Sequence, residues 1–301
     1  MLKTILKQQI IGIINLSIPV IILYQIYPAI LLSTSGKIVC SLLIGIYVFY
    51  LNYRATKTQA ESLKYIPSLY KPELEKIIVD CKMDPHSVNL RYGYSNEMVA
   101  MTILNTVSID PILCQRFNHD PEAIKVIDIL NHHIISPMAE KQKEKIEKIK
   151  NILTPDAQTF IFKHELGHVF ANYSYKKLAL IGIIATISAY IGLVTTFYFL
   201  KVLGFFAIII GITIAGLIDL IMSYSSNVLF KSREEKNADL FATKFSSPEE
   251  IKAAASFFET HQEIVNLNKS SMGILSALPS IVLTGHYDGK TRAKYLRDII
   301  Y

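Results

Sequence analysis

Long apolar runs alternate with polar segments along this chain. Four runs lack Asp, Glu, Lys and Arg: Ile10–Leu32, Ile38–Tyr53, Leu178–Leu200 and Val202–Ile218. A hydrocarbon core ~30 Å thick needs about 20 helical residues, and cations beside a shorter run can extend to the interface. Each run is therefore a predicted membrane span. The last two are separated only by a lone lysine, which predicts a tight hairpin turning near Lys201–Gly204.

The polar segment between the second and third runs predicts a mixture of helices and strands. Ser62–Cys81 has a helical pattern, with a proline near a helix start, and Glu140–Leu153 is a Lys- and Glu-rich helix expected to face solvent. Val88–Tyr94 and Met98–Ile109 contain many β-branched residues and are predicted as two strands. Thr154–Asp156 supplies a capping hydroxyl, a proline and an acid, which predicts the start of a further helix.

Composition and charge favour a lipid bilayer over nucleic acid as the partner. Hydrophobic residues make up 51% of the 301 residues, charged residues make up 19%, and the formal net charge is +6. No arginine-rich stripe with interleaved aromatics is present, so no nucleic-acid partner is expected, whereas lysines flank the apolar runs. Each hairpin tip has one lysine, while Arg54–Lys177 holds 17 basic residues and the tail after Met222 holds 10. This distribution predicts that both termini and both polar segments are cytoplasmic. The expected location is a bacterial cytoplasmic membrane.

The helix predicted to begin at Thr154 contains the sequence HELGH at His164–His168. Histidines at i and i+4 share one helical face, so both imidazoles can bind one zinc ion. Glu165 stands beside them, where a carboxylate can take a proton from a water activated by the metal. The three cysteines are widely spaced and form no ligand pair or disulfide framework, which suits a reducing compartment. The motif predicts one catalytic Zn²⁺ per chain.

A catalytic zinc needs a third protein ligand and an open fourth position. Glu234–Asp239, with the sequence EEKNAD, follows the fourth apolar run. On a helix, Glu235 and Asp239 lie on one face at i,i+4, so Glu235 is the predicted third ligand and Asp239 is placed to orient a histidine. Taken alone, Glu235 would be interpreted as a surface carboxylate on a helix that leaves the membrane. Its position on the same predicted membrane side as HELGH favours ligation.

HELGH, a membrane hairpin and then SREEKNAD together resemble the membrane gluzincins of the HtpX heat-shock protease and CAAX prenyl protease group. Their third ligand lies in an ExxAD run, which Glu235, Ala238 and Asp239 match. His286 and Arg292 are similar to the family's late histidine and the arginine six residues later. The resemblance implies that His286 helps to hold the developing oxyanion and that Arg292 supports the site. The two-plus-two arrangement of spans resembles HtpX.

The sequence departs from the family pattern at two places. The Ser-Arg pair stands three and two residues before Glu235 instead of four and three, which leaves Glu234 as an alternative ligand. The spacing to Asp239 favours Glu235, and Glu234 is then expected on the exposed side of the helix. Tyr287 replaces the usual proline after the late histidine. Ser95–Pro111 takes the place of the family's substrate-binding edge strand, which implies peptide binding by strand addition.

The sequence thus predicts an α+β fold that is predominantly helical, with two transmembrane hairpins (four spans) and a cytoplasmic zincin-like metallopeptidase domain. The expected divisions are a first hairpin at 1–53, a metallopeptidase domain at 54–177, a second hairpin at 178–222, and a helical part completing the zinc site at 223–301. The expected activity is that of a membrane-integral zinc metalloendopeptidase that cleaves membrane or membrane-proximal polypeptides in protein quality control. The sequence identifies no regulatory membrane partner.

Two alternatives stay open from the sequence. One is a site-2-type intramembrane metalloprotease, a group that also uses HELGH-like motifs but places them within a span and adds an aspartate ligand. Here the motif follows a polar domain, and Asp288-Gly289 lies in a polar tail. The other is a non-catalytic membrane scaffold with a metallopeptidase fold, against which the intact Glu165 argues.

Overall fold

The computed structural model describes residues 33–63, 72–92, 99–110, 140–269 and 289–300. By its internal contacts the chain divides into two compact units, a first of Met1–Ala55 with Lys176–Ser226 and a second of Thr56–Tyr175 with Asn227–Tyr301. The first predicted span, Ile10–Leu32, lies outside the described residues. The domain limits drawn from the sequence stay a prediction.

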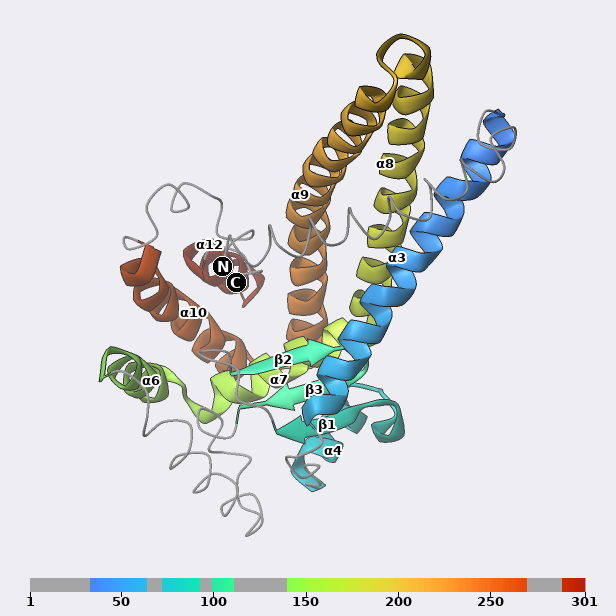
Figure 1. The fold of residues 1–301 in the computed structure, drawn as a ribbon. Helices are drawn as coiled ribbons and strands as arrows, with labels where there is room; N and C mark the ends of the chain where they lie inside the picture. Colours follow the sequence, from blue (N-terminus) through green and yellow to red (C-terminus); the bar gives the residue numbers. More distant parts are fainter. Residues whose placement is uncertain (1–32, 64–71, 93–98, 111–139, 270–288, 301) are drawn as a thin grey trace. The chain divides into compact units, whose positions relative to one another are not determined.

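Three helices in the described part of the chain are long and apolar enough to cross a membrane: α3 (Thr34–Ser62), α8 (Tyr173–Leu203) and α9 (Phe205–Lys244). They contain the second and third apolar runs and the fourth from Phe205 onward, and Figure 1 shows each as a long single helix. The membrane character expected from the sequence is supported. The four-span arrangement and the cytoplasmic placement remain predictions.

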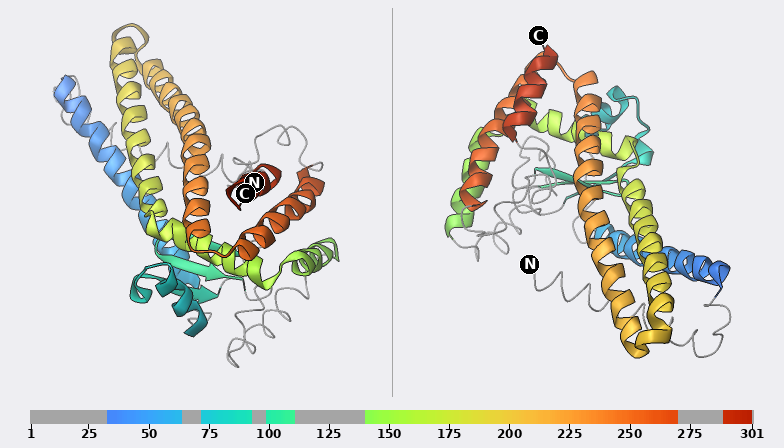
Figure 2. Two further views of the ribbon diagram at one scale, coloured as in Figure 1. Left: turned by 180° about the vertical axis from the view of Figure 1, so that it is seen from behind. Right: turned by 90° about the horizontal axis from the view of Figure 1, so that it is seen from above.

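Helices α8 and α9 form the predicted hairpin, which Figure 2 shows from two sides. The turn is at Gly204, whose φ of 52° is in the left-handed region that glycine adopts without strain. Small residues let the two helices approach closely, since a Cβ on Gly192 would lie 2.9 Å from the carbonyl oxygen of Gly211. Such backbone proximity is typical of helix pairs in membranes.

In its described residues, the second unit contains the further α-helices α4 (Pro72–Asp80), α6 (Glu140–Ile152), α7 (Pro155–Phe170), α10 (Pro248–Lys269) and α12 (Gly289–Ile300). The predicted start of α7 is confirmed, because the Thr154 hydroxyl accepts a hydrogen bond from the Ala157 N–H at 3.2 Å. The lysine-rich helix is confirmed as α6. Within the pattern predicted as helical at Ser62–Cys81, the described helix begins at Pro72.

A small sheet has the strand order β1-β3-β2, with β1 (Asn89–Tyr92), β2 (Ala100–Ile103) and β3 (Thr106–Ile109). β1 pairs with β3 in parallel, and β2 pairs with β3 antiparallel. The prediction of one strand over Met98–Ile109 is wrong, because the chain turns back at Leu104. Leu104 takes a φ of 56°, and its N–H donates a hydrogen bond to the Ser174 hydroxyl oxygen at 3.0 Å. No glycine stands at this turn, so the strand-like pattern of the sequence continues across it and gives no sign of the turn.

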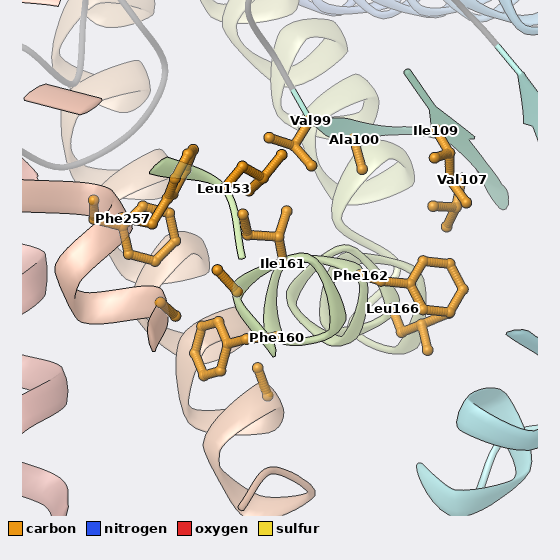
Figure 3. Packing of buried hydrophobic residues seen from close by; sticks show 14 of the residues in the cluster. Val99, Ala100, Val107, Ile109, Leu153, Phe160, Ile161, Phe162, Leu166 and Phe257 are labelled. Carbon is orange, nitrogen blue, oxygen red and sulfur yellow. The ribbon is translucent and has the colours of Figure 1, made fainter. Parts of the chain in front are cut away.

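Helix α7 is the central element of the second unit, since every residue from Ala157 to His168 is buried. Figure 3 shows Phe162 and Leu166 on the side of α7 that faces Val107 and Ile109 of β3. Phe160 meets Phe258 of α10 edge to face, with ring centroids 6.4 Å apart. A helix buried all round places its polar side chains in the protein interior, where each must be paired to offset its lost hydration. The predicted fold class, mostly helical with a small sheet, is confirmed.

Candidate metal centre

Three predicted ligands come together in the second unit. One ligand atom from each of His164 and His168 on α7 and Glu235 on α9 lies within 4.8 Å of the others. The Nε2 atoms of the two histidines are 3.1 Å apart. The Glu235 carboxylate oxygens lie 3.4 Å from Nε2 of His164 and 3.3 Å from Nε2 of His168. Two imidazoles and a carboxylate that converge on one point match the donor set of a catalytic zinc.

Asp239 determines which nitrogen of His164 faces this point. Its Oδ1 lies 2.8 Å from His164 Nδ1, and both side chains are buried. Nη2 of Arg292 is also 2.9 Å from that nitrogen, but Asp239 is the nearer neighbour, and its ionised carboxylate can only accept a hydrogen bond. We therefore assign the Nδ1 hydrogen to the bond with Asp239. Nε2 of His164 then keeps the lone pair that a metal requires.

Arg292 reaches this cluster from α12. Its Nε donates to Asp239 Oδ2 at 2.8 Å, and its guanidinium carbon lies 3.6 Å from the ring centroid of Phe258. Burial raises the pKa of the Asp239 carboxyl, but the Arg292 charge and then His164 outweigh burial and bring that pKa below its usual value. Asp239 is therefore a charged acceptor held in place from α12.

The surroundings of His164 favour positive charge. Burial and the neighbouring Arg292 lower the pKa of its imidazole, yet the charge of Asp239 and hydrogen bonds to Asp239 and Glu235 raise it to about 9. A position where carboxylates stabilise a proton so strongly also stabilises a divalent cation, since both respond to the same negative field.

Glu165 lies beside the three converging side chains and is bonded to the sheet. The hydroxyl of Thr102 on β2 is 2.7 Å from Glu165 Oε2 and 3.0 Å from the Glu165 carbonyl oxygen. Thr102 is not indicated by the sequence, because it stands 63 positions before Glu165 and no periodicity relates the two residues. The one available signal was that Thr102 falls within the predicted edge-strand region.

Gly167 explains how α7 and α9 come close enough to share a site. A Cβ on Gly167 would lie 2.9 Å from the Cα of Ala238 and 3.1 Å from its carbonyl oxygen. Real side chains do not tolerate such contacts with backbone, so only glycine permits this approach. The close approach places Glu235, one turn before Asp239, opposite the two histidines.

The structure corrects one expectation about Glu234, which is only 5% exposed and not on a solvent-facing side of the helix. The reason is that α9 is covered on several sides at this level, with Ala238 against α7 and Phe230 stacked on Tyr173. In the described part of the chain, Oε2 of Glu234 has no hydrogen-bond partner. The carboxylate grouped with the histidines is Glu235.

Tyr173 is a further residue beside the centre that the sequence did not indicate. Its ring lies 4.9 Å from the His168 ring, centroid to centroid, and stacks on Phe230 at 5.6 Å. Burial, with the nearby Glu235 and Glu234 charges, raises the pKa of its phenol well above the ordinary value. Tyr173 is therefore a neutral side chain that covers one face of His168. The predicted oxyanion residue, His286, lies outside the described residues.

Comparison with known proteins gives one family. The family model of peptidase family M48 matches residues 143–300, which include α7, the hairpin of α8 and α9, and the described helices after it. This is the family of the HtpX and CAAX prenyl proteases, in agreement with the resemblance seen in the sequence. No curated protein and no solved structure matches the chain.

Proposed function

The chain belongs to peptidase family M48, and on that premise we propose that it is a membrane-integral zinc metalloendopeptidase that cleaves membrane or membrane-proximal polypeptides in protein quality control. The family implies a metallopeptidase with polypeptide substrates. The choice of zinc, the role of each residue and the physiological task are our proposal.

The observation that supports this proposal most is the convergence of His164, His168 and Glu235, with Asp239 bonded to the outer nitrogen of His164. Two imidazoles and one carboxylate would hold the ion. Asp239 would fix the tautomer and ring orientation of His164, and Arg292 would hold Asp239. Buried groups with converging lone pairs are costly without a cation between them, so the donor set fits zinc well.

A zinc ion bound there would polarise the scissile carbonyl and lower the pKa of a water molecule. Glu165 would act as the general base. Its Oε2 is held by Thr102, which leaves Oε1 to accept the proton of the attacking water. The same carboxyl would then return the proton to the leaving amine. We expect His286 to donate a hydrogen bond to the developing oxyanion.

Strand β2 is the proposed docking edge for the substrate polypeptide, because within the described sheet it pairs on one side only. A peptide added to this edge would lie beside Glu165, which β2 contacts through Thr102. The three apolar helices would confine such an enzyme to a membrane, which motivates membrane-proximal substrates and a quality-control task.

The two alternatives have less support. The HELGH helix α7 belongs to the second unit and is not among the helices long and apolar enough to cross a membrane, unlike the motif of a site-2-type protease. A non-catalytic scaffold would not need Glu165, yet Glu165 is present and its carboxylate is hydrogen-bonded.

The proposal is tested with the purified full chain in detergent, by measuring metal content and casein cleavage with and without a chelator. We expect one zinc per chain, cleavage that the chelator abolishes, and recovery when zinc is restored. Cleavage that persists in the zinc-free protein would reject the proposal. So would a zinc-loaded protein that cleaves neither casein nor an unfolded membrane polypeptide.

A further inference from the structure

Beyond the metal ligands, the structure places one residue where the proposed base and the proposed substrate edge meet. We infer that Thr102 is a positioning residue for the proposed base: its hydroxyl aligns the Glu165 carboxylate, while its backbone N–H and C=O lie on the docking edge already proposed. Binding of a polypeptide at β2 would thereby be coupled to the orientation of the base. This inference rests on the proposed function and adds a residue that acts through Glu165.

The hydroxyl contact is specific for one carboxylate oxygen. Thr102 Oγ1 is 2.7 Å from Glu165 Oε2, and a hydroxyl has a single hydrogen to donate, so the shorter contact is the donated bond. The carbonyl oxygen of the same residue is a second acceptor 3.0 Å away, so both oxygens within reach of the hydroxyl belong to Glu165. Glu165 is only 4% exposed, so this bond is shielded from competing water. The carboxylate is thereby held through one oxygen, and no hydrogen bond from the described residues occupies the other.

The register of the sheet shows where the backbone of Thr102 points. The N–H of Asp110 donates to the carbonyl of Val99 at 3.0 Å, and Ala100 is aligned with Ile109. In an antiparallel pair, hydrogen-bonded and non-bonded positions alternate. Val99 is a bonded position, so Ala100 and Thr102 are non-bonded ones. Their N–H and C=O groups point away from β3, toward the outer edge.

The outer edge of β2 is short. Just after the strand, the N–H of Leu104 is occupied by the hydroxyl of Ser174 at 3.0 Å, which closes that end. In the described sheet no strand pairs with the outer side of β2, so Ala100 and Thr102 offer the backbone groups that a peptide can use. A peptide paired there would place its backbone against the residue that holds Glu165.

The hydroxyl is tested with Thr102→Val, which keeps the β-branched shape, and Thr102→Ser, which restores the hydroxyl. For peptide hydrolysis by the full-length zinc enzyme, Thr102→Val should lower kcat by ~10–100-fold, the usual effect of losing a bond to a charged group. KM and zinc content should be nearly unchanged, because the backbone and the metal ligands remain. Thr102→Ser should recover most of the loss. Thr106→Val on β3 is the matched control, since its hydroxyl does not contact Glu165 in the described structure.

The backbone function is tested with Ala100→Pro, which removes an outward N–H, beside Met101→Pro, which removes an inward one. Ala100→Pro should raise KM by ~2–10-fold, the usual effect of losing a neutral bond, with kcat retained. Met101→Pro should lower the melting temperature, since it breaks the pairing with Ser108. Peptides N-methylated at successive amides, assayed with the unaltered enzyme, give the same information without disturbing the strand. N-methylation of at least one amide of the peptide should raise its KM.

The outcomes separate this inference from the proposed function. An active wild-type enzyme with unchanged kcat in Thr102→Val would overturn the role of the hydroxyl alone. If the enzyme is active and its KM changes neither in Ala100→Pro nor with N-methylated peptides, the role of the β2 edge is overturned. Loss of zinc in Thr102→Val would make it a structural residue and overturn the inference. A wild-type enzyme that cleaves no polypeptide would overturn the proposed function and this inference with it.

Discussion

Arg292 binds Asp239 through two nitrogens, with Nε 2.8 Å from Oδ2 and Nη2 2.5 Å from Oδ1. Asp239 in turn bonds Nδ1 of His164 at 2.8 Å. A residue near the end of the chain therefore holds the orientation of a proposed ligand on α7, through a carboxylate on α9. Three helices far apart in the sequence depend on one buried, charged contact.

Replacing Arg292 should affect both the fold and the metal. Arg292→Leu leaves the Asp239 carboxylate buried without its cation, which should cost about 3–5 kcal/mol in the zinc-free protein and weaken zinc binding by ~10–100-fold. Arg297→Leu on the same helix is the control, because its ion pair with Glu259 is 43% and 41% exposed and should contribute less than ~1 kcal/mol. Thermal unfolding and zinc titration of both variants decide the matter. Equal effects would contradict the account.

The two neighbouring glutamates on α9 should behave differently. Glu235→Ala removes a carboxylate that lies 3.3 Å from His168 Nε2, so zinc should be lost on dialysis and cleavage abolished. Glu234→Ala should keep zinc, although its side chain is buried and its truncation can change the melting temperature. Metal stoichiometry after dialysis is the measurement. Zinc retained by Glu235→Ala and lost from Glu234→Ala would shift the ligand by one position.

The grouping of the metal-site residues was predictable from the sequence, because the information is local. His164 and His168 stand at i,i+4 in one helix, and Glu235 and Asp239 do so in another. Once two such faces are known, joining them requires only that α7 and α9 pack. Gly167 lies inside a helix, where glycine is unfavourable. The structure explains it, because a Cβ at this position would lie 2.9 Å from the Cα of Ala238.

The contacts that depend on tertiary packing were not predictable. Leu104 turns the chain in the left-handed region without a glycine, so one predicted strand became a hairpin. That hairpin brings Thr102 to Glu165, a contact that no periodicity encodes. Glu234 was expected in solvent, since a helical wheel does not show how many neighbours cover a helix.

Cys81 provides a test of the core by pH. Burial raises the pKa of its thiol from 9.0 to about 11, partly opposed by Lys163. A thiol held protonated by the fold contributes stability that is fully present below 9.0 and is lost as the pH rises toward about 11. At pH 9.0, alkylation of Cys81 should be roughly 50-fold slower in the folded chain than in the denatured chain, because about half of the denatured thiol and about 1% of the folded thiol is ionised. Comparable rates would contradict its burial.

The predicted orientation in the membrane is tested by thiol labelling. In a chain without native cysteines, Lys201→Cys at the tip of the α8–α9 hairpin should react with an impermeant reagent in intact cells. Lys148→Cys, on a side chain that is 54% exposed in α6, should react only after lysis. This follows from the excess of lysine and arginine in the polar segments. The opposite labelling pattern would reverse the topology.

The central claim is that Glu165 acts as the base beside a zinc ion that it does not bind, and Glu165→Gln tests it most directly. The substitution keeps the size of the side chain and lets the amide oxygen accept the Thr102 hydrogen bond, but removes the proton acceptor. The decisive measurement is zinc content and casein cleavage of the same purified sample. Our account predicts one zinc per chain and cleavage reduced by at least ~10²-fold. A zinc-loaded Glu165→Gln protein that cleaves near the wild-type rate would contradict it.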